Sequence, residues 1–290
     1  MKYKFVERHR PCFEVGKMCR ALNISRSGYY RWRNNPKSRR EKENDELTEV
    51  IREIHKSSRN TYGSRRVHAE LRERGYHIGY NRVTRLMRVN KIRAKTKRRF
   101  KITTHSGHSY PVAENLLGKS IQIVRLNQVW VSDITYIWTQ EGWLYLSIIM
   151  DLCSRGIVGW SMEERLTKEL VVKALEMACS RRGGVKGVIF HSDKGSQYAS
   201  YEFRGVLQKK GIIQSMSGKG NCYENAYAES LFHTIKTEEV YGSCYQTRQE
   251  ARTRLFEYIE VFYNRERKHS GLGYMSPYQF EQSMELQKVS

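Results

Sequence analysis

Two acidic residues, Asp193 and Glu229, lie in patterns that bring a carboxylate to the edge of a folded core. Asp193 comes shortly after the apolar run 188–190, which predicts a buried strand over 185–190 with the acid beyond its carboxyl end. Glu229 lies in a predicted helix over 221–232. At about 100° per residue, Asn225, Glu229 and Lys236 share one face of that helix, and apolar residues occupy another. The helix is therefore predicted to pack on one side and to present an acid and a base on the other.

A third acid, Asp133, stands in the middle of segment 128–138, which is dense in β-forming residues. A carboxylate in a buried strand needs a partner. Three carboxylates brought together without a cation would raise one another's pKa, so the pattern predicts a divalent metal held by oxygen ligands. Plainer interpretations exist, because the chain holds 30 acidic residues and Asp193 alone would be an ordinary turn residue. Asp151 also ends an apolar strand, and we expect it to cap the turn at Cys153 and not to bind metal.

Short strings around these acids resemble those of one protein family. They are Trp130-Val-Ser-Asp133-Ile-Thr-Tyr-Ile, Asp151-Leu-Cys-Ser-Arg155, His191-Ser-Asp193-Lys-Gly-Ser-Gln197-Tyr, Gly220-Asn-Cys, Ala228-Glu229-Ser with Lys236 seven residues on, and Tyr263-Asn-Arg265 followed by His269-Ser-Gly-Leu-Gly. In this order they resemble the downstream (OrfB) product of bacterial insertion-sequence transposases of the two-frame type, which carry a retroviral-integrase-like DDE catalytic core. One departure is Glu224, where the family more often has Asp.

The resemblance implies an α/β ribonuclease H-like core, a five-stranded mixed sheet flanked by helices, preceded by an all-α helix-turn-helix DNA-binding region. It implies that Asp133, Asp193 and Glu229 are the catalytic residues and hold two divalent ions, Mg²⁺ or Mn²⁺, for DNA strand cleavage and strand transfer. Lys236 lies two turns from Glu229 on the same helix face and suits a contact to a DNA phosphate beside the cut, although an ordinary solvent-exposed lysine would give the same pattern. The implied partners are the element ends and target DNA, a second copy of the chain, since two ends must be joined, and the product of an upstream reading frame.

The positive charge of the chain is concentrated in its first third. Residues 1–101 hold 30 Lys and Arg against 10 Asp and Glu, and the whole chain has a net charge of +22, so this region has the electrostatic footprint of a polyanion binder. Segment 14–33 has the pattern of helix, turn and helix, with Ser25 as the cap of the second helix and Arg26 and Arg31 as candidates to meet DNA. Any two-helix hairpin would give the same local pattern.

A second helix-turn-helix is predicted after a charged linker at 39–45. Its helices are an amphipathic one from Leu47, one that Ser64 caps and Gly75 ends, and one over 80–90. The last exposes Arg82, Arg85 and Arg88 in one stripe, which suits a phosphate backbone but equally a solvated face. The run 91–101 has seven Lys or Arg in 11 residues, which favours DNA binding and adds the candidates Lys97, Arg98 and Arg99.

These patterns divide the chain into a helix-turn-helix (1–40), a second one with a basic tail (41–101), a linker (102–125), the catalytic core (126–240) and a C-terminal helical segment (241–290). In the core we expect strands at 129–138, 144–151, 156–162, 185–190 and 212–216, with helices from 167 to Gly183 and from Ser200. A capping box, Thr247-x-x-Glu250, opens the last segment. The linker contains His105 and His108, but no Cys pair at zinc-finger spacing, so we expect no zinc there.

Composition leaves three function classes open. The six cysteines form no Cys-x-x-Cys pair, no apolar run approaches the ~20 residues of a membrane span, and the first residues lack a signal peptide's apolar region, so we expect a cytoplasmic, nucleoid-associated protein without a membrane partner. Besides a transposase, the core fits a metal-dependent nuclease without joining activity or a DNA-binding repressor with an inactive core. Two helix-turn-helix units exceed what a nuclease of low specificity needs, and the intact set of acids argues against the repressor.

Overall fold

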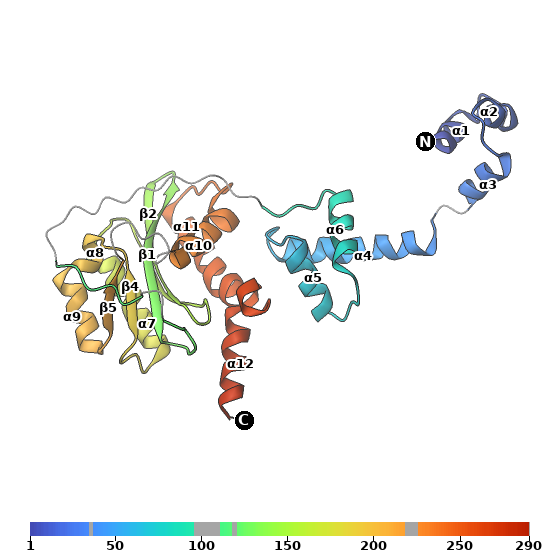
Figure 1. Cartoon of the computed structure of the whole chain (residues 1–290). Helices are drawn as coiled ribbons and strands as arrows, with labels where there is room; N and C mark the ends of the chain where they lie inside the picture. Colours follow the sequence, from blue (N-terminus) through green and yellow to red (C-terminus); the bar gives the residue numbers. More distant parts are fainter. Residues whose placement is uncertain (35–36, 96–110, 118–120, 218–225, 290) are drawn as a thin grey trace.

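The centre of the chain forms one mixed sheet (Figure 1). The computed structural model describes residues 1–34, 37–95, 111–117, 121–217 and 226–289. Within these ranges the strand order is β3-β2-β1-β4-β5. Neighbours among the first three strands pair antiparallel, whereas β4 pairs parallel with both β1 and β5. This topology confirms the predicted ribonuclease H-like core; the strands are β1 (Val129–Thr139), β2 (Gly142–Asp151), β3 (Ile157–Glu163), β4 (Ile189–Ser192) and β5 (Ile213–Met216).

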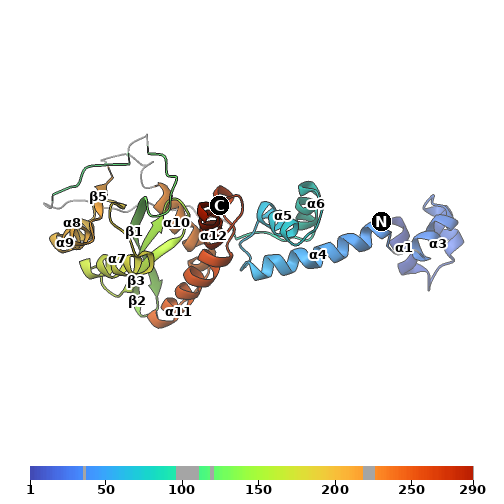
Figure 2. The same cartoon turned by 90° about the horizontal axis from the view of Figure 1, so that it is seen from below.

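Helices cover both faces of this sheet because side chains alternate along β1. Trp130 packs with α7 (Lys168–Arg182) and α9 (Tyr201–Lys210), which follow the short helix α8 (Ser196–Ala199). Val131 and Ile137 point to the other face, where α10 (Ala226–Ile235) and α11 (Arg248–Glu257) pack. Figures 1 and 2 show α7 and α10 on opposite sides of β1.

Glycines fix two details of the core. A Cβ at Gly159 in β3 would lie 2.3 Å from the carbonyl oxygen of Ala174, so only glycine lets α7 approach the sheet this closely. Gly183 has a φ of +64° and ends α7, as predicted. The strand predicted over 185–190 begins later, at Ile189, because residues 185–188 form a turn in which the Val188 N–H donates to the Val185 carbonyl.

In the described residues before the core, the chain forms six helices. The first three, α1 (Lys2–His9), α2 (Val15–Ala21) and α3 (Arg26–Asn34), pack around fully buried Tyr29. Ser25 caps α3 as predicted, with its Oγ 2.8 Å from the Gly28 nitrogen. A second group, α4 (Arg39–Ser57), α5 (Ser64–Glu73) and α6 (Tyr80–Val89), shares apolar contacts through Ile51, Leu71 and Val83.

Two predictions for this region were wrong. The segment 39–45, predicted as a charged linker, forms the first turns of α4, because Ser38 and Glu41 make a capping box. Ser64 is the first residue of α5 and not its cap, which is Gly63.

The chain ends in a helical segment that includes two π-helical stretches. α10 continues directly into η1 (Lys236–Val240), and α11 continues into η2 (Tyr258–Glu266). The predicted cap of α11 is present, since the Glu250 N–H donates to Thr247 Oγ1 at 3.0 Å. A 3₁₀ turn, η3 (Ser270–Leu272), and α12 (Pro277–Val289) follow. Among the described helices, none is both long and apolar enough to cross a bilayer, and the five described cysteines are free thiols.

Candidate active site

The register of the sheet brings Asp133 and Asp193 to the same level. β1 and β4 run parallel, and their last paired residues are Val131 and His191. Each aspartate stands two residues beyond that pair, so both lie where β4 ends: Asp193 follows β4 directly, and Asp133 lies within β1, which continues to Thr139. Asp193 is held in its turn because its Oδ1 accepts a hydrogen bond from the Gly195 N–H at 2.9 Å.

Asp133 has a carboxyl group that resists ionisation. Its pKa is raised to about 7, first by burial and then by the negative charges of Asp193 and, less strongly, Glu229. A hydrogen bond from the Ile134 N–H, 2.7 Å from Oδ1, and the positive charge of Lys236 oppose this rise in pKa. A divalent cation would relieve the repulsion, so the donor set of this site fits such an ion.

Helix α10 supplies the third acid. Leu231 and Ile235 pack against the core, while Glu229 is exposed in the first turn of the helix. Lys236 is only 7 % exposed, which excludes the alternative of an ordinary solvated lysine. Burial lowers the pKa of its ammonium, and the charge of Asp133 opposes that change. Asn225, expected on the same face, lies outside the described residues.

The three acids are electrostatic neighbours and not a closed ligand shell. Across the parts of the chain that the structure describes, no three Asp, Glu, His or Cys side chains converge closely enough to hold a metal ion. Asp151 provides the contrast that we predicted: it is completely buried, and its two oxygens accept hydrogen bonds from the backbone N–H groups of Asn127 and Cys153 at 2.7 and 2.8 Å. Both carboxylate oxygens of Asp151 therefore have backbone hydrogen-bond partners within the fold.

Tyr198 is a residue of this site that sequence patterns did not indicate. Its side chain is 1 % exposed, and its hydroxyl lies 2.8 Å from Ser132 Oγ, directly before Asp133 in β1. Burial raises the pKa of Tyr198 well above its ordinary value, and the charges of Asp133 and Asp193 add to the effect. The hydroxyl of Tyr198 is thus neutral and hydrogen-bonded, and it lies near enough to both aspartates for their charges to act on it.

Comparison with known proteins agrees with this geometry. Residues 124–222 and 229–284 match two families described as "Integrase core domain", and residues 42–100 match an "HTH-like domain". The chain is 46% identical to an insertion element IS600 protein of 31 kDa from Shigella sonnei, over 91% of this chain and 97% of that one. It is 41% identical to the transposase InsF for insertion sequence IS3A of Escherichia coli (strain K12), over 97% of this chain and 98% of the relative.

The chain belongs to the IS3 family of insertion-sequence transposases. It is accordingly a DDE transposase that binds DNA through its helix-turn-helix region. Among solved structures, the catalytic core domain of BIV integrase is similar with a TM-score of 0.42 and 17% identity, over 57% of this chain and 99% of that one.

The predicted DNA-contacting arginines of the transposase fall into two groups. Arg26, Arg31, Arg85 and Arg88 are exposed. The prediction that Arg82 is exposed was wrong. Its side chain is half-buried, and its Nε donates to Asn44 Oδ1 at 2.9 Å. Lys97, Arg98 and Arg99, like His105 and His108, lie outside the described residues.

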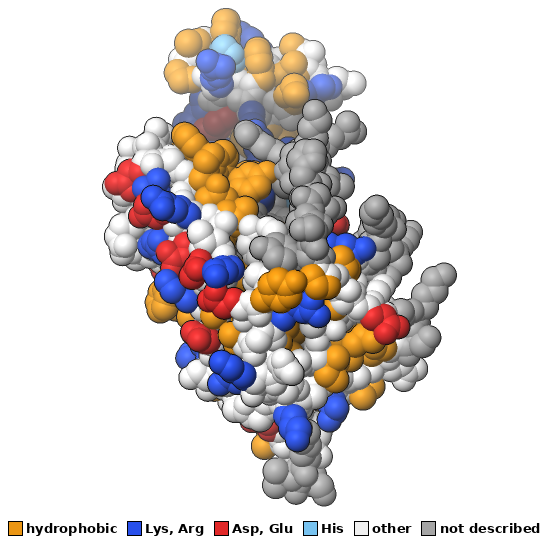
Figure 3. All heavy atoms as spheres, turned by 90° about the vertical axis from the view of Figure 1, so that its left-hand side faces the viewer, with side chains coloured by type: hydrophobic (Ala, Val, Ile, Leu, Met, Phe, Trp, Pro, Cys, Tyr) orange, Lys and Arg blue, Asp and Glu red, His pale blue; other side chains and the backbone are white. Residues whose placement is uncertain are grey.

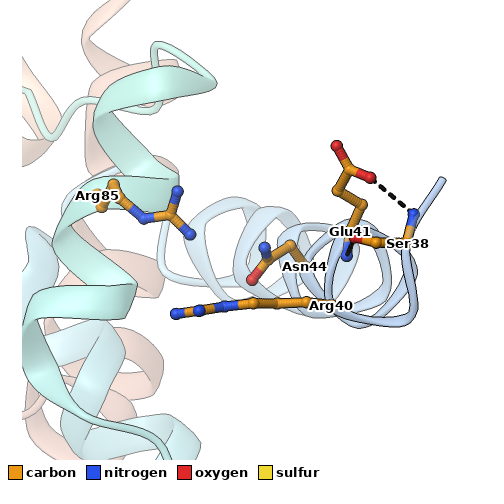
Figure 4. Close-up of a pocket in the computed structure, with 5 residues that line it drawn as sticks. All are labelled: Ser38, Arg40, Glu41, Asn44 and Arg85. Carbon is orange, nitrogen blue, oxygen red and sulfur yellow. Dashed lines mark hydrogen bonds between the residues drawn. The ribbon is translucent and has the colours of Figure 1, made fainter. Parts of the chain in front are cut away.

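Arg85 lines a hollow between α4 and α6. Figure 4 shows its guanidinium pointing toward Arg40 and Asn44 of α4. The same hollow is lined by Ser38 and Glu41, the capping pair of α4. Two guanidinium groups at one opening fit an anionic ligand such as a DNA phosphate.

A buried ion-pair network next to the site was also missed from sequence. Arg267 donates two hydrogen bonds of 2.7 Å to Glu238, which also accepts one from Tyr258, and both charged partners are at most 6 % exposed. Glu239 pairs with Arg254 at 2.9 Å and with Arg59, at the end of α4, at 3.1 Å. The network therefore joins the second helix-turn-helix to the segment that follows Glu229 and Lys236.

This network gives a physical role to the string that begins at Tyr263. The Asn264 side chain bonds both backbone groups of Ile157, at 2.9 and 3.0 Å, and so fixes the start of β3. Tyr263 donates to the Arg155 carbonyl at 3.2 Å. Together with Arg267, these residues tie the C-terminal segment to the sheet.

Proposed function

We propose that this transposase cleaves and joins the ends of its insertion sequence by metal-dependent phosphodiester chemistry, with Asp133, Asp193 and Glu229 as the catalytic acids and metal ligands. The observation that carries the proposal is the coupling of the three carboxylates around Asp133, whose pKa is raised to about 7. A fold keeps repelling acids together at a cost in stability, which is typical of a functional site. Two divalent ions, Mg²⁺ or Mn²⁺, would supply activation of the attacking oxygen and stabilisation of the leaving oxygen.

The residues of the chain have separate tasks in this proposal. Asp133 lies within β1 and Asp193 in the turn directly after β4, and together they define the position of the scissile phosphate, whereas the exposed side chain of Glu229 closes the ligand set from α10. Lys236 attracts the phosphate, and its burial means that only a phosphate seated within the site reaches it. Water attacks first and frees a 3′-hydroxyl, which then attacks a second phosphodiester, so that no covalent protein intermediate is needed.

We further propose the domain division given above, with boundaries near residues 40, 101, 125 and 240, and DNA contacts from Arg26, Arg31, Arg85 and Arg88. Joining two element ends requires at least a homodimer. The product of an upstream frame is proposed as a further partner, and the nucleoid as the place of action. Arg82 can contribute only if its bond to Asn44 opens.

The test is a cleavage and strand-transfer assay on labelled element-end DNA with Mg²⁺ or Mn²⁺. We expect Asp193→Asn and Glu229→Gln to lower the yield of nicked and joined products by more than about 100-fold. Substitution of a residue that only hydrogen-bonds to a metal ligand already lowers activity by about 10–100-fold, and these variants change a proposed ligand itself. Glu257→Gln, on an exposed acid of α11, is the control and retains activity. Nicking without joining by the wild type would indicate a nuclease or a missing upstream partner, and unchanged activity of the variants would contradict the assignment.

A further inference from the structure

Exposed apolar side chains gather in patches on the core. On the side that carries α8 and α9, hydrophobic side chains group between Lys and Arg side chains (Figure 3). Isolated exposed apolar residues need no explanation, but contiguous ones mark binding sites. Three exposed aromatic residues of the β1–β2 hairpin, Tyr136, Trp138 and Trp143, are defined here as the aromatic patch; they are 40 %, 55 % and 44 % exposed.

The aromatic patch is built by the β1–β2 hairpin. Trp138 and Trp143 are direct cross-strand partners. Their rings lie 4.8 Å apart, and the rings of Tyr136 and Trp143 lie 5.1 Å apart, both pairs edge to face. The patch is therefore a pre-formed surface whose aromatic rings are fixed by one another.

A hollow of about 360 Å³ opens beside this patch. It exists because β4 pairs with β1 only as far as Val131. Beyond that point a different segment runs along β1, and the Gln140 N–H donates to the Tyr245 carbonyl at 3.0 Å. The hollow lies between this segment and the aromatic patch, and its size is within the range of pockets that take small organic groups.

Lys236 links the hollow to the proposed catalytic acids. It lines the hollow, and its Nζ lies 5.0 Å from the centroid of the Tyr136 ring. Its charge also acts on Asp133. One cation thus stands between the proposed catalytic acids and an aromatic surface.

We propose that the aromatic patch stacks an unpaired base of the element-end DNA next to the scissile phosphate. This inference rests on the proposed function of the acids. A base reaches a hollow of this kind only after leaving the double helix, and stacking on an aromatic side chain compensates for the lost pairing. Lys236 in the lining favours an anionic nucleotide over an apolar protein segment as the occupant.

The test compares the affinity of the protein for two labelled element-end duplexes, one fully matched and one with a single unpaired base beside the cut. Dissociation constants are measured by fluorescence anisotropy in EDTA, so that no cleavage is required. We expect the wild type to prefer the unpaired duplex, and Trp138→Ala and Trp143→Ala to reduce that preference by about 5- to 150-fold. Trp138→Phe, which keeps a stacking ring, and Tyr201→Ala, an exposed aromatic on α9, should retain it.

Each other outcome has a defined meaning. Equal affinity of the wild type for both duplexes, or a preference that survives in both alanine variants with native circular dichroism, overturns the inference. A lower mass of Trp138→Ala in sedimentation without DNA would show an interface between copies and also overturn it. Unchanged cleavage by Asp193→Asn and Glu229→Gln, with the binding preference of the wild type intact, contradicts only the proposed catalytic acids.

Discussion

Two groups of acids in the core, one around Glu238 and one around Asp133, have their negative charge compensated in different ways. Glu238 is buried, and Arg267 meets it with two hydrogen bonds of 2.7 Å. Asp133 is also poorly solvated, but its strongest charged neighbour is another acid, Asp193. The first group has its compensating cation within the fold, whereas in the second the charge of Lys236 opposes the rise in the pKa of Asp133 without cancelling it. We interpret the first as a structural charge cluster and propose the second as a functional one.

Removal of Arg267 should give the largest change in stability. Arg267→Met leaves Glu238 buried without its main partner, and we expect a loss of about 3–5 kcal/mol in the free energy of unfolding. The double variant Arg267→Met, Glu238→Leu should recover most of this loss, because no charge then remains buried. Urea denaturation measures both. An equal loss in the two variants would show that packing and not charge compensation is at work.

The contribution of Asp133 to the free energy of unfolding should depend on pH. Because the pKa of Asp133 is raised from its ordinary value of 3.8 to about 7, its contribution to stability is complete below pH 4 and is lost as the pH rises through 7. In EDTA, we expect Asp133→Asn to equal the wild type at pH 4 and to exceed it at pH 8 by roughly 2–4 kcal/mol. Thermal unfolding across this range measures the difference, and a constant offset at all pH values would contradict the prediction.

A divalent cation should stabilise only the second group. We expect saturating Mg²⁺ to raise the free energy of unfolding of the wild type by about 1–3 kcal/mol, as follows for a ligand well above its dissociation constant. Asp133→Asn and Asp193→Asn should lose this response, while the double Arg267 and Glu238 variant retains it. Differential scanning fluorimetry with Mg²⁺ and EDTA is the measurement. A response equal in all four proteins would place the ion elsewhere.

The smallest effect is expected where Arg59 has two acidic partners of different exposure. Glu239 is 3 % exposed and Glu257 is 61 % exposed, measured on their side chains. Glu257→Gln should cost less than about 1 kcal/mol, because solvent screens an exposed pair. Glu239→Gln should cost more, about 1–3 kcal/mol, since the buried carboxylate of Glu239 is the shared acceptor of Arg59 and Arg254. Similar values from chemical denaturation would mean that burial does not control these pairs.

The part of the fold that could be predicted from sequence is the part governed by local patterns. Apolar β-forming runs predicted all five strands, and Gly183 predicted the end of α7. The Arg39–Asp45 turns of α4 were missed because they contain no apolar positions, and their only helical signal was the capping pair Ser38 and Glu41. Hydrophobic periodicity detects a helix only where the helix is packed against something.

Long-range pairs explain why other features could not be predicted. Lys236, Glu238 and Glu239 look like a solvated helical face in sequence, yet all are buried. The residue that makes burial of Glu238 favourable is Arg267, 29 positions later. The aromatic patch was not predicted either, because from sequence Trp138 and Trp143 could each have been core residues. Their exposure follows from the sheet, in which β4 pairs with β1 only as far as Val131.

The π-helical stretch η1 determines which changes of sequence and of length this region tolerates. α10 runs into η1 without a break, and the stretch delivers Lys236 toward Asp133 and the next acids toward the buried cations. A π-helix accommodates one residue more than an α-helix over the same span. Deletion of Thr237 would therefore preserve every charge and allow the stretch to close as an α-helix, with the later residues kept in register. Homologous chains can be expected to differ here by substitution or by one residue in length.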